Sequence, residues 1–430
     1  MSSTALTRND AGTSPLHTRV SLSARFSLHT CRRRVVRSKK PVRCSFLAAR
    51  RPCSAEPAFL DAIVELPCDT YRAIAATDPF TSSVPLIERL MRPRKARQLW
   101  WYATDEYTLV DPKRKQMRER FRSNSVAFPS SGDVILREYT HNGALELAMG
   151  NGGAVQSVHF ANDAFTGAIL WMPYLRSMLS AAGALTDRKT PWRVLNLGLG
   201  SGCLAGYVAE NCADHVISVE IDAAVVAAAQ TGGLRCVVMD NAEDAFAANA
   251  RRDEDDSKRA CVVVADANAV VTGTKSPGNF DVIFFDCFDG SGDVATLATE
   301  SFLLQLLNER WLAPGGCVIC NTPNGMKGSP ERHAYLGFGA AMVRACKASK
   351  SDFTPLTFAI PMQPQNNVLV AAPGRPNEWS LSRVQANAGS FADRSLPKGA
   401  SHVDAASCVT DAYALDVDDV KGELVESLLL

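Results

Sequence analysis

The sequence predicts an α/β protein, in which a doubly wound, Rossmann-like sheet follows a small antiparallel β meander. The first reason is the stretch 192–211, where an apolar run stops at a glycine turn and a helical pattern begins at once. The second is that later apolar runs alternate with helical patterns and end on acidic residues. The third is a set of short strand-like runs before residue 160 that are separated by Asn-Gly turns, which are typical of tight hairpins.

The first 52 residues differ in composition from the rest of the 430-residue chain. They hold twelve basic residues and one acid, whereas the remainder holds 34 basic and 44 acidic residues. Such N-termini are typical of organelle transit peptides, and Val42-Arg43-Cys44 resembles a plastid processing site. We therefore expect a chloroplast protein, with a mitochondrial address or a basic arm for nucleic acid as the alternatives. The mildly acidic remainder disfavours nucleic acid as a main partner, and no apolar run reaches the ~18 residues that span a bilayer.

Residues 53–130 form an N-terminal extension that we expect to be partly helical. The aromatic run Trp100–Tyr102 is typical of a helix that packs against a larger domain. The charged run Lys113–Arg122 is typical of a solvated helix face. Neither stretch indicates chemistry.

A small β-meander domain is predicted over residues 131–165, ahead of a Rossmann-like domain over 166–372. Its turns contain Asn142-Gly143 and Asn151-Gly152. A helix, Phe165–Ala181, is expected to connect the two domains. The three predicted strands of the meander are Asp133–Tyr139, Ala144–Met149 and Ala154–His159.

The nucleotide-binding part of the sequence is the glycine turn after the strand Val194–Leu197. Gly198, Gly200 and Gly202 form a G-x-G-x-G pattern, which lets the backbone approach a ligand at the start of a helix. The next strand ends on Glu220, whose carboxylate can accept both hydroxyls of a ribose. The third glycine of the dinucleotide pattern and a second phosphate site are missing, so S-adenosylmethionine fits better than a dinucleotide. The alternative is that these glycines only allow close packing of a helix on a strand.

Acidic residues also end two later strands. Cys261–Ala265 stops at Asp266, and Phe280–Phe285 stops at Asp286. Doubly wound sheets bind ligands at the carboxyl ends of their strands. The sequence therefore predicts that Glu220, Asp266 and Asp286 converge on one site.

The rest of the chain continues the same alternation up to Ala372. Arg235–Met239, ending at Asp240, is an alternative third strand, but Cys261–Asp266 lies closer along the chain to the next strand, as a compact crossover demands. Residues 373–430 are polar and poor in aromatic residues, so we expect a mostly disordered tail. The other predicted elements are the helices Ala223–Gln230 and Phe302–Trp311, a turn at Pro314–Gly316, the strand Cys317–Asn321, and the paired strands Phe353–Ile360 and Asn367–Ala372.

The 13 cysteines are scattered along the chain without the spacing of a disulfide framework, so we interpret them as reduced. Cys317 and Cys320 form a C-x-x-C pattern within a predicted strand. Side chains three positions apart on a strand point to opposite faces, so these two cannot share one metal ion. We expect no metal site.

Three segments resemble the spermidine synthase-like branch of the class I S-adenosylmethionine-dependent methyltransferase superfamily. They are Val-Glu-Ile-Asp at 219–222, Val-Val-Val-Ala-Asp-Ala at 262–267, and Phe-Asp-Val-Ile-Phe-Phe-Asp-Cys-Phe-Asp at 280–289. Gly153-Ala-Val-Gln156 is similar to the small N-terminal sheet of that family. The resemblance covers about residues 133–372 and extends to aminopropyltransferases and to methyltransferases such as the C-terminal half of the eukaryotic elongation-factor methyltransferase. It implies S-adenosylmethionine, or its decarboxylated form, as the cofactor.

The resemblance also implies roles for individual residues. Asp286 and Asp289 would be catalytic and would face the reacting amine. The alternative for Asp286 is a carboxylate that caps the next helix. The residues that would bind the donor are Gln156, Gly198, Gly200, Ser201, Gly202, Glu220, Ile221, Asp266 and Ala267.

Three departures from the aminopropyltransferase pattern favour methyl transfer. Ser201 replaces an acid of the glycine loop, Gly290 replaces a proline, and Gly167 stands where a pocket tyrosine would be. A diamine pocket needs carboxylates at both ends and an aromatic wall for the methylenes. We therefore expect a methyltransferase that acts on a small-molecule or protein amine. Polyamine aminopropyl transfer and a catalytically degenerate binding module are the alternatives, and the sequence leaves a homodimer open.

Overall fold

The computed structural model describes residues 117–128, 132–140, 143–150, 154–159, 170, 172–249, 260–274, 278–288, 297–324, 329–360, 366–397 and 402–415. All of them belong to the second of the two units into which the chain divides, Cys53–Leu430. The predicted transit peptide, most of the N-terminal extension and the catalytic candidate Asp289 lie outside the described residues.

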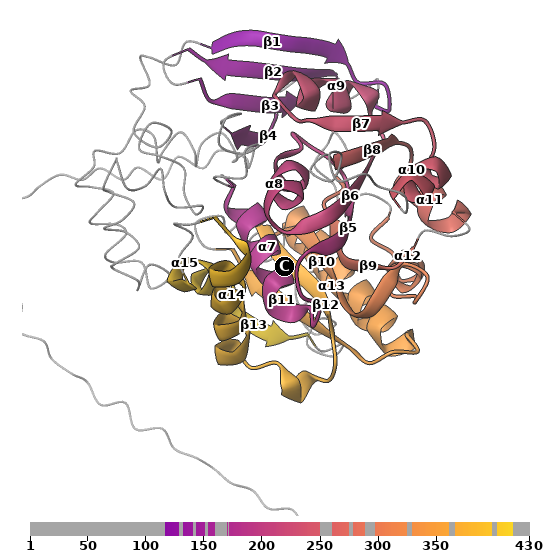
Figure 1. Cartoon of the computed structure of the whole chain (residues 1–430), viewed down its shortest axis with the longest axis vertical. Coiled ribbons are helices and arrows are strands. Elements are labelled where there is room, and N and C mark those ends of the chain that lie inside the picture. Colours follow the sequence, from indigo (N-terminus) through magenta and orange to yellow (C-terminus); the bar gives the residue numbers. More distant parts are fainter. Residues whose placement is uncertain are drawn as a thin grey trace, which may run out of the picture. The chain divides into compact units, whose positions relative to one another are not determined.

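The predicted meander is confirmed as an antiparallel sheet in the order β1-β2-β3-β4 (Figure 1). Val134 and Leu136 alternate along β2 with residues of the opposite face, and they pack with Leu147 of β3 against Ala224 and Val225 of helix α9 (Ala223–Thr231). This period of two fixes which face of the sheet meets the helix. The strands are β1 (Met117–Asn124), β2 (Asp133–Tyr139), β3 (Leu145–Met149) and β4 (Ala154–His159).

Strand β1 corrects one prediction, because Lys113–Arg122 was expected to be a helix face. From Met117 on, this run is a strand that pairs with β2. Its arginines stand at every second position, which is the period of a strand, and they are paired with acids across and along the strand. Arg118 and Arg120 each lie 2.8 Å from Glu138, and Arg122 bonds Glu119 and Asp133. The number of charges in this run suggested a helix face, whereas their spacing of two residues indicates an edge strand.

The large sheet has nine strands in the order β13-β11-β12-β10-β9-β5-β6-β8-β7. Strands β5 to β10 pair in parallel, and β11, β12 and β13 complete one side in antiparallel fashion. This is the predicted doubly wound, Rossmann-like architecture. The strands are β5 (Trp192–Leu197), β6 (Ala213–Glu220), β7 (Cys236–Met239), β8 (Ala260–Val264), β9 (Phe280–Phe285), β10 (Leu312–Pro323), β11 (Phe353–Ala359), β12 (Asn366–Pro373) and β13 (Thr410–Ala414).

The choice of third strand is confirmed, because β8 lies next to β6 in the sheet. The alternative segment is also a strand, β7, which pairs with the far side of β8. The predicted turn at Pro314–Gly316 instead lies within β10, where it appears as an irregularity in the pairing between Leu312 and Cys317.

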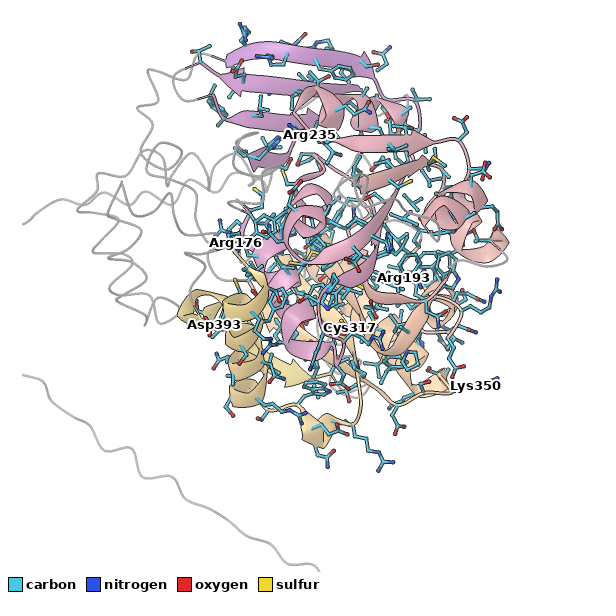
Figure 2. All side chains as sticks on the ribbon, in the orientation of Figure 1. Arg176, Arg193, Arg235, Cys317, Lys350 and Asp393 are labelled. Carbon is cyan, nitrogen blue, oxygen red and sulfur yellow. The ribbon has the colours of Figure 1, made fainter. Side chains whose placement is uncertain are left out.

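Helices cover both faces of the large sheet (Figure 1). Apolar residues of α7, α8, α14 and α15 pack in one core cluster, and those of α10, α11, α12 and α13 pack in another. Cys317 and Cys320 belong to different clusters, which confirms that their side chains face opposite sides, and Cys317 lies in the interior (Figure 2). The helices are α7 (Pro173–Leu185), α8 (Cys203–Asn211), α9 (Ala223–Thr231), α10 (Ala242–Asn249), α11 (Ala267–Gly273), α12 (Glu300–Leu306), α13 (Pro330–Ala348), α14 (Leu381–Ser395) and α15 (His402–Ser407).

Two helices begin or end elsewhere than predicted. Helix α7 starts at Pro173 rather than Phe165, because proline suits the first helical position and disfavours a helical residue before it. Helix α12 ends at Leu306 rather than Trp311. Trp311 leaves the helix and packs against Phe280 and Phe246 in the core.

The expected disordered tail is wrong for most of its described length. Helix α14 packs Val384, Ala388 and Phe391 into the core, and their spacing of four and three residues gives one helical face. Phe391 stacks on Trp192, with ring centroids 5.0 Å apart. Strand β13 then pairs with β11. Mean polarity suggested disorder, while the helical period of a few apolar residues specified a packed element.

No helix of the described part is long and apolar enough to cross a membrane.

Candidate active site

The glycine loop and the predicted acids come from neighbouring strands of the large sheet. The loop follows β5, which lies between β9 and β6, and β8 lies beyond β6. Backbone hydrogen bonds tie the ends of these strands together. They run from Gly198 N to Val219 O (2.9 Å), from Asp286 N to Leu197 O (2.8 Å) and from Ala265 N to Glu220 O (2.9 Å). The carboxyl ends of β9, β5, β6 and β8 therefore form one edge, as the sequence predicted.

The three glycines of the loop differ in their surroundings. All three have positive φ, which L-residues with a side chain rarely adopt. A Cβ on Gly198 would overlap the backbone of Asp286, and one on Gly202 would overlap Leu234, so both positions are needed for packing. A Cβ on Gly200 would meet nothing within 4 Å. Gly200 therefore borders open space at this point of the loop.

Ser201 does not face that opening. Its side chain is buried, and its hydroxyl lies 2.9 Å from the sulfur of Cys203 in helix α8. This serine serves to hold the loop to the start of the helix.

Glu220 is buried at the end of β6 and is bonded to the glycine loop. Its Oε2 accepts from the amide of Leu199 (2.9 Å), and its Oε1 accepts from the amide of Asp222 (3.0 Å). Burial raises the pKa of this carboxyl, while the amide hydrogen bonds oppose the rise. The backbone amide of Gly200 is a third donor to this carboxyl. A carboxylate offers about four acceptor positions, so one remains for a hydroxyl of a ligand. Ile221 beside it is exposed and apolar, which suits the flat face of a nucleobase.

Asp222, which the sequence did not single out, connects the small sheet to this edge. It is fully buried at the N-cap of α9, where it accepts from the amide of Ala224. It also accepts from the hydroxyl of Ser125 (2.5 Å) and the amide of Val126 (3.2 Å), in the link between β1 and β2.

Asp286 lies at the end of β9, where polar side chains from two other elements meet its carboxylate. Asn321 at the end of β10 donates to Oδ1 at 2.8 Å, and Tyr174 in the first turn of α7 donates a further hydrogen bond. Asn366 of β12 donates in turn to Asn321 (3.0 Å). Burial raises the pKa of Asp286 to about 6, against the opposing effect of the bonds from Asn321 and Tyr174.

The two partners of Asp286, and Asn366 behind them, were missed by the sequence reasoning. Asn321 was only the last residue of a predicted strand, although polar residues at strand ends had been the signal elsewhere. The family resemblance places the pocket tyrosine at Gly167, which lies outside the described residues. In the structure, Tyr174 of the following helix contacts Asp286 instead.

The thiol of Cys287 is influenced by the charges of all three predicted acids. Burial raises the pKa of its thiol well above the ordinary value, and the charges of Glu220, Asp286 and Asp266 add to this effect. The three acids therefore lie within electrostatic reach of the residue that follows Asp286.

The remaining predicted site residues are Asp266, Ala267 and Gln156. Asp266 is exposed and caps helix α11 by accepting from the amide of Asn268 (2.9 Å), while Ala267 is buried in the first turn of that helix. Gln156 is partly buried in β4, on the edge of the small sheet. Among the described residues, no group of three or more His, Cys, Asp or Glu side chains is arranged to hold a metal ion.

No protein-family model and no curated protein matches this sequence. Solved structures do. A probable spermidine synthase from Corynebacterium glutamicum is 15% identical and matches over 72% of this chain and 94% of its own, with a TM-score of 0.44. The spermidine synthase from Thermotoga maritima is 20% identical over 72% and 88% of the two chains, with a TM-score of 0.43. Human methyltransferase-like protein 13, in complex with SAH, is 19% identical over 52% and 91%, with a TM-score of 0.38.

Proposed function

We propose that this protein is a class I S-adenosylmethionine-dependent transferase that moves a methyl group to an amine-bearing acceptor, either a small molecule or a protein. One observation carries the proposal. The open position at Gly200 lies in a loop between Glu220, which keeps one acceptor position for a ribose hydroxyl, and Asp286, which is held by Tyr174 and Asn321.

The residues fit such a donor and its reaction. S-adenosylmethionine supplies a methyl group on a positively charged sulfur. Glu220 and Ile221 would bind the adenosine end, and Gly200 would leave room for the chain that carries the sulfur. Asp286 would orient the acceptor amine and take its proton as the new N–C bond forms and the C–S bond breaks. The carboxylate form of Asp286 is needed for this role.

Aminopropyl transfer is the second candidate, and one observation favours it. Tyr174 places an aromatic ring beside Asp286, so the pocket has more in common with a diamine site than the sequence indicated. In that reaction the same amine attacks a propyl carbon of decarboxylated S-adenosylmethionine.

Donor binding tests the proposed function directly. In isothermal titration calorimetry, Glu220→Ala should bind S-adenosylmethionine about 5- to 150-fold more weakly than the wild type, since losing the ribose acceptor costs ~1–3 kcal/mol. Asp240→Ala is the matched control, because Asp240 also follows a strand but is exposed and lies at the edge strand β7. Circular dichroism checks that each variant is folded. If the wild type and Glu220→Ala bind equally well, the donor site is wrongly placed.

A comparison of donors separates the two reactions. We expect S-adenosylmethionine to bind more tightly than its decarboxylated form, because the glycine loop Gly198–Gly202 carries no acid, so no negative charge of the loop repels the donor carboxylate. At ~4 Å and an effective dielectric constant near 20, such a repulsion is on the order of several kcal/mol before screening. The measurement is a competition between the donors, followed by incubation of each with putrescine. Preference for the decarboxylated donor together with formation of spermidine would replace methyl transfer with aminopropyl transfer.

A further inference from the structure

A chain of two amides ends on the carboxylate of Asp286. Asn366 Nδ2 donates to Asn321 Oδ1 at 3.0 Å, and Asn321 Nδ2 donates to Asp286 Oδ1 at 2.8 Å. Asn321 is 3% exposed, so its amide has little access to water. The antiparallel pairing of β10 with β12 brings the two asparagines together, because Asn366 is the first residue of β12 and lies beside the end of β10.

The two hydrogen bonds between these side chains run in one direction, toward Asp286. An asparagine side chain has one accepting oxygen and one donating nitrogen. Because Asn366 donates to the oxygen of Asn321, the nitrogen of Asn321 is turned toward Asp286. The neighbour of Asp286 on the β10 side is therefore a fixed donor, which bonds best to an ionised carboxylate.

We propose that Asn321, fixed by Asn366, is a positioning residue for Asp286. It holds one carboxylate oxygen in place and favours the charged form, so that the group is ready to receive the proton of an acceptor amine. The role of Asp286 in this statement rests on the proposed function, whereas the coupling of Asn321 to the charge of Asp286 does not.

The groups around Asp286 determine its pKa, which the amide of Asn321 lowers. Helix α7 brings the hydroxyl of Tyr174 to Asp286, and β10 and β12 bring uncharged amides. Cys287 follows Asp286, and this thiol lies within reach of the charges of Glu220 and Asp266. Burial raises the pKa of Asp286 to about 6, although the hydrogen bonds from Asn321 and Tyr174 oppose this rise. Of these two bonds, the one from Asn321 lowers the pKa more.

The experiment measures how the free energy of unfolding of the full chain depends on pH, by urea denaturation between about pH 4 and 8. The unfolded pKa of Asp286 is near 3.8 and the folded one is about 6, so the folded state binds more protons in this interval. Stability should therefore fall as pH rises from about 4 to 6, relative to Asp286→Asn, in which the group does not titrate.

Asn321→Asp should move the midpoint of that fall upward by about one pH unit or more, since two carboxylates then share the place of one amide bond. Combining Asn321→Asp with Asp286→Asn restores one amide and one carboxylate, and should return the midpoint close to that of the wild type. Asn366→Ala frees the amide of Asn321 and should shift the midpoint upward by less, and this variant decides the matter if Asn321→Asp does not fold. The control is Asn387→Asp, whose amide bonds Ala184 O in α7 away from this edge, and it should keep the wild-type midpoint.

An unchanged midpoint in Asn321→Asp, or in Asn366→Ala where the first variant does not fold, would overturn the proposal. Coincident pH profiles of the wild type and Asp286→Asn would also overturn it. Neither donor nor acceptor is present in these measurements. A failure of the proposed function would instead appear as absent donor binding in calorimetry.

Discussion

Replacing Phe391 with alanine is expected to lower the free energy of unfolding by about 3–5 kcal/mol. The side chain is 2% exposed and stacks on Trp192, the first residue of the central strand β5. It also lies directly against Gly183 of α7, where any Cβ would overlap its ring. The substitution therefore leaves a cavity between helix α14, helix α7 and the sheet.

Urea denaturation of the full chain measures this effect. Leu381→Ala is the matched control in the same helix, because Leu381 is 37% exposed and its loss should cost little. A second pair tests the same contact from the other side. Gly183→Ala should destabilise by overpacking, by about 1–3 kcal/mol, whereas Gly337→Ala in α13 meets nothing within 4 Å and should stabilise by about 0.5–1 kcal/mol. If Phe391→Ala unfolds at the same urea concentration as Leu381→Ala, residues 381–395 are not part of the core.

Asp286→Asn is expected to reduce the rate of methyl transfer by about 10²- to 10⁴-fold, the usual contribution of a positioned acid or base. The amide cannot take a proton from the acceptor amine, although its oxygen can still accept the hydrogen bond from Asn321. Affinity for S-adenosylmethionine should change little, because Glu220 and the glycine loop are retained. The measurement is transfer of a radioactive methyl group to the small-molecule and protein fractions of an organelle extract.

Asp240→Asn, which removes the same charge at the edge strand β7, is the control and should retain activity. In the wild type the rate should rise as pH increases through about 6, since the carboxylate form becomes populated there. Asp286→Asn should lack this rise. Equal rates for the two variants would remove Asp286 from the mechanism.

Most of the sheet could be predicted from the sequence, because its strands are short apolar runs that end on glycines or acids. The convergence of Glu220 and Asp286 followed from the rule that parallel strands end at one edge. Tyr174 and Asn321 could not be found in this way. Their role depends on which helix start and which strand lie beside β9, and that is set by packing between segments far apart in the chain.

The errors share a physical cause. β1 and the C-terminal segment were interpreted from their charge and mean polarity, whereas a few residues at the correct period decide whether a segment packs. Phe391, for example, is buried in the core although many of its neighbours in the sequence are polar. The family resemblance implied that Ser201 lies beside the donor, where related proteins carry an acid of the glycine loop, but in the structure its hydroxyl bonds Cys203 at the start of the helix.

Strand β13 has a consequence for how the protein is made. It pairs with β11, and of the strands in the described part of the chain it is the last to be synthesised. Because synthesis proceeds from the N-terminus, β5 to β12 leave the ribosome before the strand that covers β11. During that interval the backbone groups of β11 on this side are an open sheet edge, which another nascent chain could pair with. Chaperone demand during translation should therefore be greatest late, when the sheet is nearly complete but its last strand has not yet been added.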